Sequence, residues 1–314
     1  MTDLREEDVE AVLETLRSGW LTMGPRIQAF EGEFAAWAGA PHAVACSSGT
    51  AALHLALLAQ RLEPGERVTV PALGGRAAAE AVRHCGGEPV FADVLAPERP
   101  VLDPDQVRTR VSVAVHLHGH EAGAATVHDC RSAVAARPAG TACFSFADGR
   151  QLPMGEGGMV TTPDDDAAAR VRLLRAHAMT SGTWDRHRGH SDSYDVVDIG
   201  FNFRLDEPRA ALGSSRLRRL HEDLEAARAT AASWATAVPG AQPAEVPGAF
   251  PVLVADAAAR DRAVAALRAA GLTAWTEPLL DDAAPRAREA AERLVVVALD
   301  PAVAAGQVAR ALGG

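Results

Sequence analysis

Short apolar, β-branched stretches alternate with helical or loop segments through the first half of the chain, and this alternation most constrains its fold. The expected strands are RVTVPAL (67–73), EPVFADV (88–94), VSVAVHLHG (111–119), ATVHD (125–129) and TACFSF (141–146). Strands that are apolar along their whole length are typical of a parallel sheet buried on both faces. The alternation therefore predicts an α/β fold with a mostly parallel sheet sandwiched by helices.

Apolar residues at helical spacing predict helices over 6–17, 27–38, 165–178 and 209–235. The stretch 46–59 predicts a turn that opens a further helix, because it begins with good capping residues. A Pro/Gly-rich segment, 237–249, predicts a loop. Strand and helix patterns alternate again after it, so we expect a large domain over 1–220 and a small α/β domain over 221–314.

Composition excludes several classes of partner. The net charge is −10 and there is no basic run, which argues against nucleic acid, since such binding needs clustered cations. No apolar stretch is long enough to span a bilayer. The acidic, amphipathic start of the chain is unlike a signal or transit peptide. The four cysteines show no paired spacing and are interpreted as reduced thiols of a cytoplasmic protein.

The chain contains no lysine: all 31 of its basic side chains are arginine. Codon bias in a GC-rich genome explains such a preference at surface positions. It does not explain the loss of a lysine that does chemistry. The composition thus excludes any reaction that needs a lysine amine from this chain.

Several long motifs occur in an order that is found in one enzyme family. They are SGWLTMGPRIQAFEGEF, AVACSSGTAALHLAL, VPALGGRAAAEAVRHCGGEPVFADV, VHLHGH, FSF, GEGGMVTT and YDVVDIGFNFRLDEPRAALG. Through them the chain resembles the DegT/DnrJ/EryC1/StrS sugar aminotransferases, pyridoxal phosphate (PLP) enzymes of fold type I. The resemblance runs from about Asp8 to about Leu220. It implies a fold-type-I aminotransferase-like fold, with a C-terminal small domain that is shortened here.

The resemblance implies a phosphate or anion cup at Ser48, Gly49 and Thr50, together with Ser145 of the FSF motif. Independently of the family, backbone N–H groups at a helix N-terminus combined with hydroxyls bind anions. The alternative interpretation is an ordinary helix cap.

Asp129 matches the family's aspartate, which pairs with the cofactor's pyridine nitrogen. Arg131 stands two residues later, and a cation there could occupy Asp129 as an ion pair instead. Gly75 stands where the family has an aromatic residue that stacks on the cofactor ring. Neighbouring Arg76 is a candidate substitute and, like Arg131, a candidate substrate ligand. The alternative for Gly75 is a plain turn.

Arg150 stands six residues before Glu156, where the resemblance implies the cofactor lysine. A Schiff base needs a neutral amine, whereas guanidinium stays protonated and offers only donors. Arg150 therefore excludes lysine-dependent transamination. It could bind a carboxylate or phosphate through two parallel hydrogen bonds in a catalytic role, or it could be structural.

Three alternating histidines, His116, His118 and His120, precede His128 and could bind a transition metal from one face of a strand. We expect no metal site, because Gly119 suggests that the strand ends there and the family gives His116 no metal role. His116 is retained as a candidate acid–base residue.

The resemblance implies that Asn202 and Arg204 reach across a dimer interface toward the partner's cofactor phosphate. Arg204, and His187 within 180–190, are also candidate substrate ligands. Both segments could equally be solvated loops. We expect a homodimer, or a heterodimer with an active paralogue.

These observations favour a repurposed, PLP-independent enzyme that acts on a small sugar-like, phosphorylated or carboxylated intermediate in natural-product (deoxysugar) biosynthesis, with no cofactor. One alternative is a sugar dehydratase-like enzyme that holds pyridoxamine phosphate (PMP), or PLP, non-covalently. Another is a catalytically silent subunit that pairs with an active PLP aminotransferase.

Overall fold

The computed structural model describes residues 4–180 and 193–313, which form two compact units. Unit 1 consists of the described residues of Met1–Glu66, Ala81–Gly87 and Arg137–Leu220. Unit 2 consists of those of Arg67–Glu80, Glu88–Ala136 and His221–Gly314. The division into domains 1–220 and 221–314 stays a prediction.

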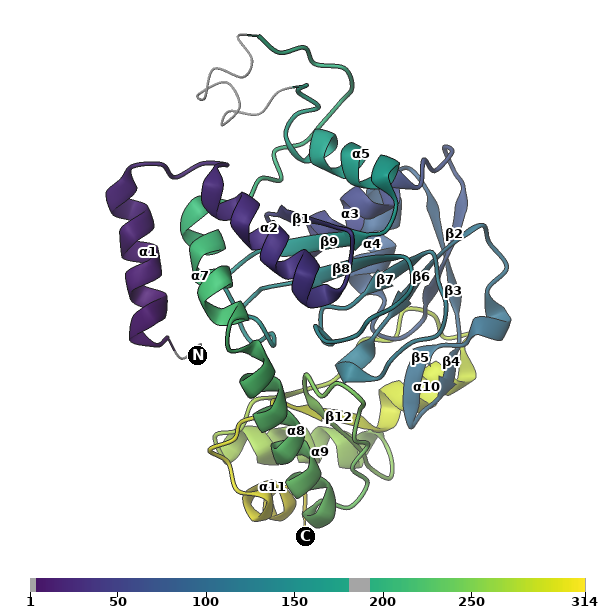
Figure 1. The fold of residues 1–314 in the computed structure, drawn as a ribbon. Coiled ribbons are helices and arrows are strands. Elements are labelled where there is room, and N and C mark those ends of the chain that lie inside the picture. The colour runs from purple at the N-terminus through teal and green to yellow at the C-terminus, as the bar shows by residue number, and fades with distance from the viewer. Residues whose placement is uncertain (1–3, 181–192, 314) are drawn as a thin grey trace. The chain divides into compact units, whose positions relative to one another are not determined.

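Unit 1 contains an antiparallel set of strands. They are β1 (His42–Cys46), β9 (Gly158–Thr162) and β8 (Thr141–Ser145), with β9 paired to both of the others (Figure 1). Cys46 and Ser145 both lie opposite Gly158, so β1 and β8 end beside the residue at which β9 begins. The strand at 141–146 was expected, whereas β1 was not.

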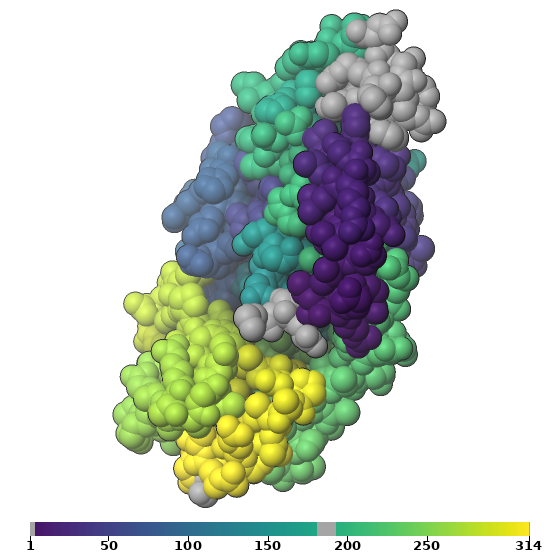
Figure 2. Space-filling model, turned by 90° about the vertical axis from the view of Figure 1, so that its left-hand side faces the viewer, coloured from purple at the N-terminus to yellow at the C-terminus, as the bar shows by residue number. Residues whose placement is uncertain are grey.

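The helices of unit 1 are α1 (Glu6–Ser18), α2 (Pro25–Ala38), α3 (Gly49–Ala59), α5 (Asp165–Arg175) and α7 (Glu207–Leu217). Helix α1 lies along α7, as Figure 1 shows, and Figure 2 views the face on which α1 is exposed. The expected helices at 6–17 and 27–38 are confirmed to within two residues. The helix expected over 165–178 ends at Arg175, since His177 and Ala178 both have positive φ.

A buried ion pair attaches α1 to the rest of unit 1. Asp8, with no exposed surface, accepts hydrogen bonds from Nη1 and Nη2 of Arg219 at 2.8 and 2.5 Å. Burial alone would raise the pKa of Asp8, but bonds from Arg219, Ser215 and the Arg5 backbone lower it to about 2. The carboxylate is therefore charged in the folded protein and depends on Arg219 for compensation.

The helix predicted over 209–235 is divided in the structure. Helix α7 ends at Leu217 and α8 (Leu220–Ala237) follows after two residues in a turn. Arg219 lies in this turn, with its backbone N–H bonded to the carbonyl of Arg216. The Ala/Leu/Arg pattern continues through the turn, so helical spacing alone does not reveal the break.

Unit 2 contains a set of parallel strands. In spatial order they are β7 (Val127–Asp129), β6 (Val111–Val115), β2 (Arg67–Pro71) and β3 (Glu88–Ala92). Each was expected from an apolar run, and parallel pairing is confirmed. The carboxyl ends of parallel strands meet at one edge. The residues that follow β2, β6 and β7 therefore come together there.

The connection between β6 and β7 is unusually short. It spans residues 116–126 and contains only the 3-10 turn η2 (Leu117–Gly119), although parallel neighbours are ordinarily joined by a helix. Ala122 and Ala125 of this connection pack against buried alanine and leucine side chains of unit 2. The expected strand at 111–119 thus ends at Val115, and His118 adopts a positive φ of 55°.

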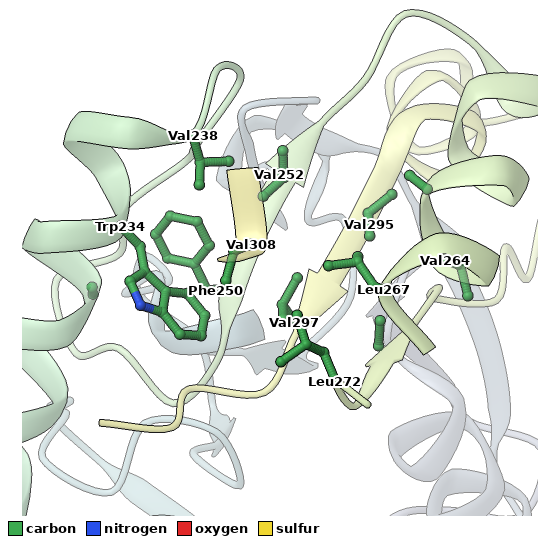
Figure 3. Packing of buried hydrophobic residues seen from close by; sticks show 13 residues of the cluster. Trp234, Val238, Phe250, Val252, Val264, Leu267, Leu272, Val295, Val297 and Val308 are labelled. Atoms are coloured by element: carbon green, nitrogen blue, oxygen red, sulfur yellow. The ribbon is translucent and has the colours of Figure 1, made fainter. Parts of the chain in front are cut away.

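The C-terminal part of unit 2 has its own antiparallel strands and core. The strands are β10 (Phe250–Leu253), β12 (Leu294–Val297) and β11 (Ala274–Trp275), and the helices are α8, α9 (Ala257–Ala269), α10 (Pro285–Arg293) and α11 (Ala305–Ala311). Figure 3 shows the core, where the rings of Trp234 and Phe250 meet edge to face, with centroids 5.3 Å apart. The predicted loop at 237–249 begins with the last residue of α8 and otherwise contains only an isolated β-bridge, between Ala241 and Val252.

The remaining elements are α4 (Arg76–His84), β4 (Val94–Ala96), β5 (Arg99–Leu102) and η1 (Pro104–Gln106). Helix α10, which was not expected, is capped from a distant loop. Asp93 accepts hydrogen bonds from the backbone N–H groups of Ala287 and Arg286, at 2.7 and 3.1 Å. Among the described residues, no helix is long and apolar enough to cross a membrane.

We predict that Asp8→Ala lowers the free energy of unfolding by about 3 kcal/mol, because it removes the buried partner of Arg219 and leaves that guanidinium the exposed Glu7 carboxylate at 3.7 Å. Urea denaturation measures the loss. Glu10→Ala is the matched control, since Glu10 is on the same helix and forms an exposed pair with Arg17 at 2.8 Å. The control is expected to cost no more than about 1 kcal/mol. Equal losses in the two variants would contradict the anchoring role of Asp8.

Candidate functional site

The first predicted site lies at the N-terminus of α3 in unit 1. Ser48 is the N-cap, and its Oγ accepts a hydrogen bond from the backbone N–H of Ala51 at 3.1 Å. Gly49 and Thr50 belong to the first turn, where N–H groups have no acceptor within the helix. Thr50 is exposed. Two backbone donors and a hydroxyl thus remain at the positive end of the helix dipole, which suits an anion.

Close backbone approaches bring Ser145 to the start of this helix. A Cβ added to Gly49 would lie 2.6 Å from Cβ of Ser145, and one added to Gly158 would lie 2.2 Å from the carbonyl oxygen of Ser48. Larger residues at either glycine would push the strands away from the helix. The structure therefore places Ser48, Gly49, Thr50 and Ser145 together, as the anion cup requires.

The GFNFR segment adjoins this cup through its backbone. The N–H of Ser47 donates to the carbonyl of Phe203 at 2.8 Å. Asn202 is exposed and forms an isolated β-bridge with Ala176. Nη2 of Arg204 lies 3.4 Å from Nε2 of His177. Asn202 and Arg204 thus belong to the same region of unit 1 as the cup.

Arg150 lies in the loop that joins β8 to β9. Its N–H donates to the carbonyl of Ala147 at 3.2 Å. Two further backbone bonds, from Phe146 to Gly157 and from Met154 to Phe146, close the loop at 2.9 and 2.8 Å. The side chain is half-buried. These backbone hydrogen bonds hold residue 150 in place within the loop, five residues after Ser145.

The second predicted site is at the carboxyl edge of the parallel strands in unit 2. Asp129, the last residue of β7, is 1% exposed. Its Oδ2 accepts a hydrogen bond from Nη1 of Arg131 at 2.6 Å, and its Oδ1 accepts one from the Arg131 backbone N–H at 3.1 Å. Nη2 of Arg131 donates to the carbonyl of Gly74. The structure thus contains the ion pair between Asp129 and Arg131 that the sequence left open as an alternative.

Gly74 and Gly75 follow β2 at the same edge, and neither has room for a side chain. Gly74 has a φ of +70°, and a Cβ added there would lie 2.6 Å from Cδ1 of Leu117. A Cβ at Gly75 would lie 2.3 Å from the carbonyl oxygen of Pro71. No aromatic ring can therefore be presented from position 75 with this backbone.

His116 is paired with another histidine. Its Nδ1 accepts a hydrogen bond from the N–H of Ala122 at 3.3 Å, so a neutral ring carries its proton on Nε2. That nitrogen lies 3.1 Å from Nδ1 of His128. Because His128 and Asp129 are consecutive on β7, their side chains point to opposite faces. The His116 ring is therefore not on the side of the strand that holds the Asp129 carboxylate.

The other two alternating histidines contact different segments. Nε2 of His118 lies 3.4 Å from Oε1 of Glu277, and Nδ1 of His120 lies 3.6 Å from Oε2 of Glu245. Glu245 also pairs with Arg99. Among the described residues, no group of three or more His, Cys, Asp or Glu side chains could hold a metal ion. The histidines attach the β6–β7 connection to the C-terminal part of unit 2.

The remaining candidates lie elsewhere. Arg76 is exposed on α4, with its Nη1 3.8 Å from a carboxylate oxygen of Glu80. His187 lies outside the described residues. Sequence reasoning missed Glu245, Glu277 and the carbonyl of Gly74 as partners of its candidate residues. Each is more than 50 positions from its partner, and no local pattern indicates it.

The chain is similar to known proteins of one enzyme family. A family model described as the DegT/DnrJ/EryC1/StrS aminotransferase family matches residues 2–251. The spore coat polysaccharide biosynthesis protein SpsC of Bacillus subtilis is 36% identical over 246 residues, which cover 69% of this chain and 62% of SpsC. GDP-perosamine synthase of Caulobacter vibrioides is 36% identical over 250 residues, which cover 71% of this chain and 64% of the synthase. Both matches thus span less than two thirds of the relative's length.

A solved structure extends the likeness to nearly the whole chain. DesV of S. venezuelae, in complex with a ketimine intermediate, superposes with a TM-score of 0.85 at 29% identity. The superposition covers 98% of this chain and 93% of DesV. The predicted fold class, fold-type-I aminotransferase-like, is thereby confirmed.

The buried histidine pair predicts acid lability. Burial, together with His128, lowers the pKa of His116 from 6.5 to about 4. The unfolded chain then binds more protons than the folded one, so stability is lost as pH falls from about 6.5 to about 4. The shift corresponds to about 3 kcal/mol. Asp8 contributes only at lower pH, between about 3.8 and about 2.

The measurement is urea denaturation at a series of pH values. His116→Gln is expected to reduce the loss of stability between pH 6.5 and 4. His221→Gln, at an exposed position on α8, is the control and should keep the wild-type dependence. An unchanged pH dependence in His116→Gln would exclude His116 as its source.

Proposed function

Because the chain belongs to the DegT/DnrJ/EryC1/StrS aminotransferase family, we propose that it is a lysine-free member that has abandoned Schiff-base transamination. It acts without PLP on a small sugar-like, phosphorylated or carboxylated intermediate, in the setting of natural-product (deoxysugar) biosynthesis. It works in the cytoplasm as a homodimer.

The absence of lysine carries this proposal. The internal Schiff base of a PLP enzyme forms between the cofactor and a neutral amine, and no side chain of this sequence supplies one. Arg150 is held in the β8–β9 loop, and its guanidinium can neither form that bond nor accept a proton. Loss of a general base alone typically costs about 10²–10⁴-fold in rate.

The cup at the start of α3 supports binding of a phosphorylated or carboxylated ligand. The free N–H groups of Gly49 and Thr50 and the hydroxyls of Thr50 and Ser145 suit such an anion. The name of one relative, GDP-perosamine synthase, is consistent with a nucleotide-sugar ligand. In this proposal Arg150 orients an anionic group of the same substrate through charge-assisted hydrogen bonds.

The residues around Asp129 do not fit the family's cofactor. Both carboxylate oxygens already accept hydrogen bonds from Arg131, and position 75 has no room for a stacking ring. The same observation weighs against the PMP-dependent dehydratase, which needs no lysine but does need its ring held. We therefore assign no step to a pyridoxal-type cofactor.

A second candidate function is a silent subunit that pairs with an active PLP aminotransferase. It is favoured by an apolar segment on the surface close to Asn202: Val196, Val197 and Ile199 are 63%, 59% and 85% exposed. Co-expression with a lysine-containing member of the family, followed by light scattering, separates the candidates. A stable homodimer that excludes the second chain supports the enzyme. A one-to-one complex that forms in preference to the homodimer supports the subunit.

We predict that the natural protein forms no covalent adduct on a side chain when it is incubated with PLP, reduced with borohydride, digested and mapped by mass spectrometry, in which the N-terminal amine is scored separately. Arg150→Lys is expected to be modified at far lower PLP concentration than Arg172→Lys. Arg172 is exposed on α5, so its variant measures non-specific labelling of a surface amine.

The comparison has two informative failures. A site-specific adduct on the natural protein, or amino transfer from an amino acid to a keto-sugar, would overturn the proposed function. Equal labelling of the two variants would show that PLP does not bind beside position 150.

A further inference from the structure

We propose that Arg131 forms an ion pair with Asp129 and thereby excludes a cofactor that contains a pyridine ring. This inference rests on the proposed function and names the residue responsible for it. A cofactor ring that paired its nitrogen with Asp129 would have to approach a carboxylate that already holds a guanidinium, whose positive charge would repel a protonated ring nitrogen. In this protein one residue supplies donors to both oxygens.

The two bonds come from different parts of Arg131. The backbone N–H takes Oδ1 at 3.1 Å and Nη1 takes Oδ2 at 2.6 Å, so the residue folds back over the carboxylate two positions before it. The Asp129 side chain is 2% exposed and that of Arg131 is 17% exposed. Charge-assisted bonds that are shielded from water are among the stronger hydrogen bonds in proteins.

A third bond holds the guanidinium in place. Nη2 donates to the carbonyl of Gly74, which follows β2 at the same edge. Arg131 therefore bridges the ends of β7 and β2, the two loops from which the family's ring contacts come. If Arg131 swung away, it would leave the Gly74 carbonyl and the buried carboxylate without this partner, so displacement by a ligand is opposed at two points.

The backbone at Gly75 rules out a stacking contact that would stabilise a bound ring. A stacking aromatic residue cannot be placed there, because a Cβ would lie 2.3 Å from the carbonyl oxygen of Pro71. A ligand ring would thus have to break the Arg131 bonds with no stacking contact from this position in return.

The test compares binding of PMP, pyridoxamine and inorganic phosphate by titration calorimetry. Arg131→Ala removes the guanidinium but keeps the backbone bond to Oδ1, so Asp129 stays in position while Oδ2 becomes free. Arg137→Ala is the matched control: it removes the same charge from the same β7–β8 connection, where Arg137 stacks on Trp37 at 4.0 Å. Arg131→Ser provides the same comparison if the alanine variant is unstable.

We expect Arg131→Ala to bind PMP at least tenfold more tightly than the natural protein, with unchanged affinity for inorganic phosphate. Arg137→Ala should behave like the natural protein. Equal affinity for PMP in the natural protein and in a folded Arg131 variant would overturn the inference. That result would leave the proposed loss of Schiff-base transamination intact, because a covalent adduct or amino transfer by the natural protein tests that loss independently of PMP binding.

Discussion

The hydrogen bonds of Arg131 tie together the ends of two parallel strands in unit 2. Asp129 ends β7, and Gly74 follows β2, so a single guanidinium spans the edge at which α/β proteins commonly bind ligands. Burying a carboxylate without a counter-charge costs free energy. The guanidinium of Arg131 supplies that counter-charge. This contact determines what the edge can bind, because the Asp129 carboxylate is hydrogen-bonded to Arg131 and not to a ligand.

The short connection between β6 and β7 explains the histidines. Eleven residues without an α-helix must cross from one parallel strand to the next. Three side chains secure them: His116 by its contact with His128, His118 by Glu277 and His120 by Glu245. A spacing that resembled a metal site thus serves to attach a loop. Burial lowers the pKa of His116 and of His120. Protonation of these rings at low pH therefore opposes their buried positions and weakens the attachment.

The sequence predicted what depends on local patterns and on the family's motifs. The parallel strands follow from fully apolar runs, and the pairing of Asp129 with Arg131 follows from opposite charges two residues apart. Helix α10 was missed because its cap, Asp93, lies far away in the sequence. The division near Arg219 was missed for a related reason: that side chain pairs with Asp8, more than 200 residues away. Contacts between residues that are far apart in the sequence do not alter the hydrophobic periodicity, so the sequence pattern does not reveal them.

Three features weigh against a pyridoxal cofactor in the function proposed here, and they lie in three different loops. Arg150 stands where the family resemblance implies an amine, Arg131 pairs with the Asp129 carboxylate, and Gly75 has a backbone that admits no side chain. The start of α3, by contrast, has its cap, its glycines and its hydroxyls in place. A helix N-terminus of this kind suits an anion whether or not that anion carries a pyridine ring. The proposed function therefore separates the two features: it uses the anion site and does not use the contacts of a ring.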